Sequence, residues 1–441
     1  MEPLGEETGV VSRATRLPSP SVRAALSAAE SPRTFWSAPD EPTVVGSGAA
    51  AVVTATGTDR FTAVREAGES LFDHGNVHAG TEAARPRLFG GFAFHDDHAG
   101  ESPWNGFPGA QFLLPRRQVT YTADGAWLTV NAVGPDATPR TVERRLEESV
   151  DRLSSLSEPA PADPTAVLER TRTTSREEWR ESVTDATDRI AAGELRKVVL
   201  AQALRARLDR PIAVHDVLAR LSDTYPDCYR FLVEPAGDGA TPSFFGATPE
   251  RLVGLRGRTV STGALAGTTG RGDTPAEDEW LARELMADEK NVHEHEIVAE
   301  TIRDQLEPYA AAVSTGERTV RRLATVQHLE TPITAELADE EHVLSLVEAL
   351  HPTPAVGGLP PERALETIRE TEPFDRGWYA APVGWFDAAG YGSFAVALRS
   401  AVAAGETATL FAGVGIVADS DPDAEWDEVQ LKYRPMLDEL E

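Results

Sequence analysis

The stretch Leu410–Lys432, LFAGVGIVADSDPDAEWDEVQLK, decides how the rest of the chain is arranged. It begins as an apolar run in which Gly413 and Gly415 leave room for a ligand to approach the backbone, which indicates a strand beside a binding site. Asp421 and Pro422 then supply a helix start, because aspartate caps a helix N-terminus and proline fits its first turn. The sequence therefore predicts a strand that leads directly into a helix.

The predicted helix carries Glu425, Glu428 and Lys432 at positions i, i+3 and i+7, so the three side chains share one face. Two carboxylates and an ammonium beside a glycine-lined strand suit a cation and an anionic ligand together. For this segment alone, the more ordinary interpretation is a solvated acidic helix with a Glu428–Lys432 ion pair. The rest of the chain decides between the two.

The composition is that of an enzyme-sized globular protein with a strong acidic excess. The chain has 441 residues, 41% of them hydrophobic, and a formal net charge of -29. This charge argues against nucleic acid or an anionic membrane as a partner, because phosphate groups would be repelled, and it suggests a halophilic protein kept soluble in concentrated salt. Cys228 is the one cysteine, which excludes an intrachain disulfide framework and fits a reducing cytoplasm.

Neither a membrane span nor a secretory signal is predicted. No uninterrupted apolar run approaches the length of a membrane span, and the N-terminal sequence MEPLGEETGVVSR lacks a basic region followed by an apolar core. We therefore expect a cytoplasmic protein, and we expect it to be a monomer.

Lysine is rare in this chain. Only Lys197, Lys290 and Lys432 are lysine among 42 basic residues, which leaves 39 arginines. A desolvated lysine can lose its proton and act as a base, whereas arginine cannot usefully do so. Each lysine is thus a candidate for chemistry, and the alternative for any one of them is a chance survivor of arginine-favouring codon usage.

The chain is expected to form a single domain after a disordered start. Residues 1–30 are rich in proline, serine and glutamate without sustained periodicity, which indicates disorder. Residues 31–165 are expected to be a sheet-rich N-terminal part and residues 166–441 the catalytic part. The proline-rich connector Ser157–Pro164 is interpreted as a loop, so residues 31–441 form one domain in this prediction.

Hydrophobic periodicity and turn residues predict the elements of both parts. Helices are predicted at Thr141–Leu156, Ser175–Ala192, Pro211–Leu221, Thr274–Leu306, Val343–Leu350 and Pro361–Thr371, and strands at Thr43–Thr56, Arg87–Phe94, Gln118–Val133 (a hairpin), Arg196–Leu204, Tyr229–Glu234, Thr241–Phe245, Ala324–Leu329 and Gly392–Ser400. The glycine-rich stretch Thr259–Gly272 is expected to turn tightly or to bind an anion, although it lacks the Gly-Lys-Ser/Thr ending of a P-loop.

Two further glutamates are candidate site residues. Glu250 follows a Thr-Pro turn that could hold a carboxyl in a partly apolar pocket, and an exposed turn glutamate is the ordinary alternative. Glu294 lies between His293 and His295, but two histidines at i and i+2 of a helix do not face each other, so zinc is not expected. Glu294 suits a hard cation such as Mg²⁺ better, and a solvated charged helix is the alternative.

Ten short strings follow one another along the chain: KVVLA, ATPERL, ALAGT, EH, HL, HPTPAVGG, RGWYAAPVGW, VALRSA, AGVGIV and EWDEVQLK. Their order is the one seen in chorismate-utilising enzymes. The chain resembles this family, and within it isochorismate synthases of the menaquinone-pathway type, relatives of anthranilate, aminodeoxychorismate and salicylate synthases. The resemblance extends from Ser175 to the C-terminus and is weaker upstream, where LFGGFAF and WNGFPGAQFLLP are similar to the N-terminal part of isochorismate synthases.

The resemblance implies a fold and a role for each candidate residue. The fold is α+β, like that of anthranilate and aminodeoxychorismate synthases, with two large β-sheets packed face to face and helices outside. Lys197 would be the base that activates water, and Glu250 the acid that protonates the departing hydroxyl. Mg²⁺ would be the cofactor, bound by Glu294 and Glu428 and supported through water by Glu425. The substrate-binding residues would be His328 and Thr353 along the ring, and Arg399, Lys432 and the amides around Gly413 and Gly415 at the carboxylates.

The implied reaction is the reversible isomerisation of chorismate to isochorismate, by attack of water at C2 with loss of the C4 hydroxyl, feeding menaquinone synthesis. The chain departs from the family pattern at Phe411, where tyrosine is common, at Thr269, where many relatives have arginine, and at Asn291, where salicylate synthases carry an acid. The alternatives are a salicylate synthase, an ammonia-using relative, or a non-catalytic salt-adapted binding module. Lys197 speaks against use of ammonia, because ammonia-using relatives have a non-basic residue there.

Overall fold

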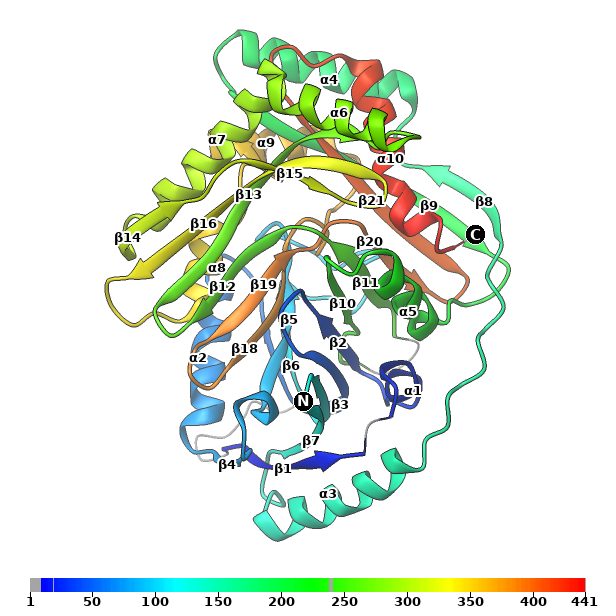
Figure 1. The fold of residues 1–441 in the computed structure, drawn as a ribbon, viewed down its shortest axis with the longest axis vertical. Coiled ribbons are helices and arrows are strands. Elements are labelled where there is room, and N and C mark those ends of the chain that lie inside the picture. Colours follow the sequence, from blue (N-terminus) through cyan, green and yellow to red (C-terminus); the bar gives the residue numbers. More distant parts are fainter. Residues whose placement is uncertain (1–8, 19, 238–240, 441) are drawn as a thin grey trace.

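The computed structural model describes residues 9–18, 20–237 and 241–440, and its strands form one hydrogen-bonded network (Figure 1). The centre of the network is β6 (Ala110–Thr122), which pairs along one edge with β3 (Thr43–Ala55). Along its other edge β6 pairs with β5 (Arg87–Phe92) and, further on, with β7 (Gly125–Ala132). Two arms of sheet therefore extend from β6 in opposite directions.

The first arm continues from β3 through antiparallel neighbours to the strands that carry Lys197, Gly413 and Gly415. Its order is β2 (Arg33–Ser37), β10 (Tyr229–Val233), β11 (Ser243–Thr248), β20 (Ser400–Ala404), β21 (Thr407–Ile416), β9 (Lys197–Leu208) and β8 (Val167–Arg172), and β17 (Gly358–Leu359) pairs with the start of β9.

The second arm continues from β5 and is also antiparallel. Its order is β18 (Pro382–Asp387), β19 (Gly392–Val396), β12 (Arg251–Arg256), β13 (Thr259–Gly270) and β16 (Val326–Leu337), and β16 pairs further with β14 (Ala310–Thr315) and β15 (Thr319–Arg322). Beside β7 lie β1 (Val11–Leu17) and, next to it, β4 (Asn76–His78).

Helices cover the outer faces and close the ends of the arms. They are α1 (Val22–Ser27), α2 (Arg60–Asp73), the 3-10 turn η1 (Glu82–Ala84), α3 (Pro139–Ser154), α4 (Arg176–Ala191), α5 (Val214–Thr224), α6 (Pro275–Ala287), α7 (Glu289–Leu306), α8 (Val343–Leu350), α9 (Pro361–Thr371) and α10 (Pro422–Leu437). In Figure 1, β13 and β16 lie on the left and β9 and β21 on the right, with α6, α7 and α10 at the top where the two arms approach each other.

An aromatic cluster from both parts of the sequence fills the space between the arms. Trp104 packs edge-on against Phe244 with ring centroids 5.1 Å apart, and Phe107 packs edge-on against Trp378 at 5.2 Å. Trp104 and Phe107 belong to the N-terminal part, while Phe244 and Trp378 belong to the catalytic part, so neither part can bury its aromatic side chains without the other.

Strand pairing also runs across the two parts, because β2 pairs with β10 and β5 pairs with β18. In the motif RLFGGFAF, a Cβ added at Gly90 would lie 1.8 Å from the carbonyl oxygen of Gln111, so β5 can lie this close to β6 only with glycine there. Of the helices among the described residues, none is long and apolar enough to span a bilayer.

Three predictions of local structure are wrong. Within residues 1–30, positions 1–8 and 19 lie outside the described residues, but β1 and α1 are ordered, because β1 finds partners in β7 and β4 that are distant in sequence. The single helix Thr274–Leu306 is two helices, since Asp288 has an extended ψ of 116° and caps the second one. The glycine-rich Thr259–Gly272 is mostly the strand β13, which pairs with β12 on one side and with β16 on the other, and is not a loop.

Candidate active site

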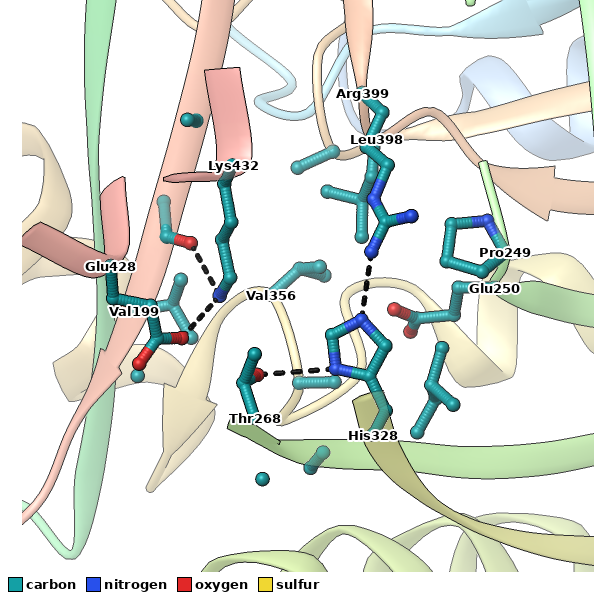
Figure 2. A pocket seen from close by; sticks show the side chains of 18 of the residues that line it. Val199, Pro249, Glu250, Thr268, His328, Val356, Leu398, Arg399, Glu428 and Lys432 are labelled. Atoms are coloured by element: carbon teal, nitrogen blue, oxygen red, sulfur yellow. Dashed lines mark hydrogen bonds and ion pairs between the residues drawn. The ribbon is translucent and has the colours of Figure 1, made fainter. Parts of the chain in front are cut away.

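A cavity lies between the ends of the two arms, and the predicted site residues gather around it. Its walls come from β21 of the first arm, from β13 and β16 of the second, and from α7 and α10 (Figure 2). Lys197 and Thr353 lie buried behind the wall. The residues predicted from sequence that line the cavity directly are Glu250, Glu294, His328, Arg399, Gly413, Gly415, Glu425, Glu428 and Lys432.

Lys197 opens β9 and is paired with Glu294 of α7. Its side chain is 1% exposed, and its Nζ lies 2.9 Å from Oε1 of Glu294. Gly415 makes room for this pair, because a Cβ there would lie 2.5 Å from the Glu294 oxygen and 2.8 Å from Cε of Lys197. Burial raises the pKa of Glu294, but the nearby Lys197 outweighs this effect and the net pKa is lowered. Glu294 is therefore a carboxylate at neutral pH.

Glu250 follows β11 after the Thr-Pro turn and is 5% exposed. Burial raises the pKa of its carboxyl to about 7, although the charges of Lys197 and Lys432 and an interaction with Thr353 lower it in part. Thr353 lies near enough to lower this pKa, and its hydroxyl oxygen is buried without a hydrogen-bond partner among the described residues. The interpretation of Glu250 as an exposed turn residue is therefore wrong, and near neutrality it can hold a proton.

Arg399, His328 and Thr268 are joined by hydrogen bonds on the side of the cavity away from Glu428 and Lys432 (Figure 2). Nη2 of Arg399 donates to Nε2 of His328 over 2.8 Å, so the ring proton is on Nδ1, which donates to the Thr268 hydroxyl over 3.1 Å. Burial and the adjacent guanidinium hold the pKa of His328 well below its usual value, which keeps the ring neutral. The other terminal nitrogen of Arg399, Nη1, is buried without a partner and is a spare donor for an anion.

Two unusual backbone conformations lie beside these hydrogen-bonded residues. Arg399 has a φ of 48°, a left-handed conformation that is uncommon for a residue with a side chain. Thr268 follows a β-bulge in β13 at Gly267, whose φ is 76°. The amide of Thr268 donates to Oδ1 of Asn291, 3.2 Å away, which is how Asn291 enters the cavity wall. Both irregularities thus occur where a side chain must be aimed into the site.

Carboxylates and lysines alternate at the mouth of the cavity. Glu428 pairs with Lys432 at 2.8 Å, and Lys432 also donates to the carbonyl of Gly413 at 3.0 Å (Figure 2). Glu425, buried in the first turn of α10, pairs with Lys290 at 3.0 Å. The Glu428–Lys432 ion pair of the ordinary interpretation is thus present, but it borders the cavity and is not on an open surface. All three lysines of the chain adjoin this one site.

The three glutamates do not form a ready-made metal cluster. Within the described part of the chain, no group of three or more histidine, cysteine, aspartate or glutamate side chains is arranged to hold an ion, and each of the three glutamates contacts a lysine instead. The donor set still fits Mg²⁺, which takes one or two carboxylates and keeps several waters. Glu294 and Glu428 are hard oxygen donors from two helices on the same cavity.

Sequence reasoning gave no role to two residues of the wall, Tyr379 and Arg376. Tyr379 stacks on Phe411 with ring centroids 5.2 Å apart. The Tyr379 side chain thus brings a hydroxyl group near Phe411, which has none. Arg376 is buried against Glu372 and donates to the carbonyls of Val199 and Val356, which holds the cavity floor together. Both residues belong to the string RGWYAAPVGW, and this string is the feature of the sequence that could have pointed to them. Thr269 pairs with Gln327 in the sheet and is absent from the cavity wall.

The sequence and the fold are both similar to those of known proteins. The chorismate binding enzyme family matches residues 6–441. The chain is 38% identical to isochorismate synthase MenF of Bacillus subtilis over 92% of this chain and 88% of that protein, and 36% identical to the salicylate biosynthesis isochorismate synthase of Pseudomonas aeruginosa over 93% and 85%. Among solved structures, it is similar to MenF, the menaquinone-specific isochorismate synthase from Escherichia coli, with a TM-score of 0.82 and 28% identity over 100% of this chain and 96% of that one.

Anthranilate synthase component I from Streptococcus pneumoniae shares the fold, with a TM-score of 0.74 at 21% identity over 91% of this chain and 93% of that one. The predicted fold class is therefore confirmed, with the two expected sheets present as two arms of one network. The chain belongs to the family of chorismate-binding enzymes.

Proposed function

We propose that this protein is an isochorismate synthase, which interconverts chorismate and isochorismate. The observation that carries the proposal is a buried lysine and a buried carboxyl, Lys197 and Glu250, at one cavity, with the pKa of Glu250 raised to about 7 by burial. A base and an acid in one pocket are what water addition at C2 and departure of the C4 hydroxyl require. The similarity to the Bacillus subtilis and Escherichia coli enzymes supports the same activity.

The residues divide the work of the reaction between them. Lys197, once neutral, accepts a proton from the attacking water, and Glu294 stabilises the ammonium that results at a distance of 2.9 Å. Glu250 gives its proton to the leaving C4 hydroxyl. Nη1 of Arg399 offers a buried donor to a substrate carboxylate, and the neutral ring of His328 holds the guanidinium in place through its 2.8 Å hydrogen bond. Because substrate and product are isomers with the same groups, the same residues serve the reverse reaction.

Mg²⁺ is proposed as the cofactor, held by Glu294 and Glu428 and supported through water by Glu425. When bound, it would neutralise a substrate carboxylate and act as a Lewis acid there. The residues proposed along the substrate are His328 and Thr353 at the ring, and Lys432 with the backbone at Gly413 and Gly415 at a carboxylate. A menaquinone pathway, a halophilic cytoplasm and a monomeric state remain predictions.

Product analysis tests the proposal directly. Purified protein is incubated with chorismate and Mg²⁺ in high salt, and the products are separated by liquid chromatography, with Lys197→Ala as the control. The expected product is isochorismate in equilibrium with chorismate. Salicylate with pyruvate would favour a salicylate synthase, an aminated product with ammonia would favour the ammonia-using relatives, and no turnover would favour a binding protein. Each of these three results would overturn the proposal.

A further inference from the structure

We propose that Lys290 is a positioning residue, which ties the helix bearing Glu294 to the helix bearing Glu428 and thereby sets the separation of these two carboxylates. Its Nζ lies 3.0 Å from Oε1 of Glu425. The inference rests on the magnesium part of the proposed function and adds to it a residue that acts through its contact with Glu425.

The ion pair occupies equivalent places on the two helices. Lys290 lies in the first turn of α7, four residues before Glu294. Glu425 lies in the first turn of α10, three residues before Glu428. Residues at these spacings share a helix face, so on each helix the ion pair lies one turn away from the carboxylate that would bind the metal. A change in the Lys290–Glu425 contact is therefore passed to both carboxylates over a single turn of rigid backbone.

The two helices are otherwise anchored to different parts of the molecule. α7 packs on β13 and β16 of the second arm, whereas α10 packs on β21 of the first arm and on α4. Among the side chains that the structure describes, Lys290 and Glu425 form the direct ion pair between these helices. Without this contact, α10 loses its ion pair to α7, and among the described residues Glu294 stays tied to the first arm only through Lys197 of β9, which does not hold Glu428.

Burial makes Glu425 dependent on its partner. The Glu425 side chain is 4% exposed and that of Lys290 is 34% exposed, so the lysine reaches inward from the rim to a carboxylate that water hardly contacts. Removing one partner of such a pair leaves an uncompensated buried charge, which destabilises the surrounding arrangement. The first turn of α10 would then have to rearrange, and Glu428 would move with it.

Plain electrostatics predicts the opposite effect on metal binding, which makes the inference testable. A lysine next to three carboxylates repels a divalent cation, so if Lys290 acts only through its charge, its removal tightens Mg²⁺ binding. If Lys290 positions the helices, its removal weakens Mg²⁺ binding, by about 10-fold or more, which is the usual cost of losing a residue that orients metal ligands.

The experiment measures Mg²⁺ affinity without chorismate, by calorimetric titration and by the dependence of thermal unfolding on Mg²⁺. The variants are Lys290→Met, Glu425→Gln, both together, and Lys290→Arg, which can still pair. Arg318→Met is the matched control. Arg318 also pairs with a glutamate of α7, Glu296, at 3.1 Å, but Glu296 is exposed to solvent.

Both single variants should bind Mg²⁺ about 10-fold more weakly, the double variant should be no worse than either, and Lys290→Arg and Arg318→Met should resemble wild type. Unchanged or tighter binding by Lys290→Met, or a double variant restored to wild-type affinity, would overturn the inference. Chorismate conversion by the wild type is measured separately. Its absence would refute the proposed function, whereas normal conversion with tighter Mg²⁺ binding by Lys290→Met would refute only the role of Lys290.

Discussion

Replacing Gly415 by alanine should inactivate the enzyme without unfolding it. The added Cβ would lie 2.5 Å from Oε1 of Glu294, 2.8 Å from Cε of Lys197 and 3.3 Å from its Nζ. All three atoms are at the ends of flexible side chains, so the backbone of β21 and β9 can stay paired while the lysine and the glutamate move apart. The substitution therefore acts on the geometry of the proposed base more than on the fold.

The size of the effect follows from the displacement. The Glu294 and Lys197 side chains would have to move away from the new Cβ by roughly 1 Å. A misplacement of about 1 Å costs on the order of 10²-fold in rate. We expect kcat to fall by about 100-fold, equivalent to about 2.7 kcal/mol, with a small change in the temperature of unfolding. Product formation from chorismate and differential scanning fluorimetry measure the two quantities.

Two other glycines provide the controls for this experiment. Gly254→Ala places its Cβ no closer than 3.8 Å to Ser261, so it should leave both rate and stability unchanged. Gly90→Ala meets backbone 1.8 Å away and should lower stability strongly. A Gly415→Ala variant with wild-type kcat would refute the placement of Lys197 as the base. A variant that loses stability as Gly90→Ala does would refute the argument that only side chains must yield.

The remaining predictions test the other parts of the site. Lys197→Arg should be nearly as inactive as Lys197→Ala, with kcat lowered roughly 10²- to 10⁴-fold, because a guanidinium keeps the charge but does not accept the proton; near-normal turnover would show that another group activates water. Arg399→Lys should raise KM while the fold persists, since one ammonium cannot both hold His328 and reach the carboxylate; unchanged kcat and KM would exclude Arg399 from the pocket. Burial raises the pKa of Glu250 to about 7, so activity should fall as pH rises through about 7. The stability of the wild type relative to Glu250→Gln should fall as pH rises from about 4.5 to about 7, because the folded state holds this proton more tightly than the unfolded chain does. A stability difference that does not change with pH would contradict the protonation of Glu250. EDTA should abolish activity and Mg²⁺ should restore it where Zn²⁺ does not, and full activity in metal-free buffer would contradict the metal site.

Local patterns were sufficient for elements whose residues contact their sequence neighbours. The helix start at Asp421 is an example, since the Asp421 side chain accepts hydrogen bonds from the amides of Asp423 and Ala424 as capping predicts. The hairpin predicted at Gln118–Val133 is another, since β6 and β7 pair there as expected. In both cases the information lies within a few residues.

Elements that depend on distant partners were missed for the same physical reason. The glycine-rich Thr259–Gly272 did not indicate the strand β13, because only its first residues pair with the neighbouring strand β12. Along its length β13 pairs with β16, whose partner residues lie 56 (Gly270–Val326) to 77 (Thr259–Glu336) positions further along. The ordered β1 likewise depends on β7. The break at Asp288 was hidden because the pattern of α6 and α7 continues across it, while the capping role of its side chain needs the structure to be seen.

For the site, too, the sequence points to candidate residues but not to the contacts between them. The scarcity of lysine singled out Lys197, Lys290 and Lys432, but the sequence could not show that each would contact a different one of Glu294, Glu425 and Glu428. These partnerships are made between β9 and α7, between α7 and α10, and within α10. Only the last is visible as an i,i+4 spacing in the sequence.

The pairing of lysines with glutamates explains how an acidic protein admits a doubly negative substrate. Each of the three lysines pairs with one of the three glutamates, so these pairs add no net charge, and Arg399 is a buried cation beside them. A divalent cation alone would add two positive charges to this largely buried space, which is costly, and a dianion bound with it offsets them. On this reasoning chorismate and Mg²⁺ stabilise each other in the site, and the lysines keep the carboxylates neutralised until both arrive.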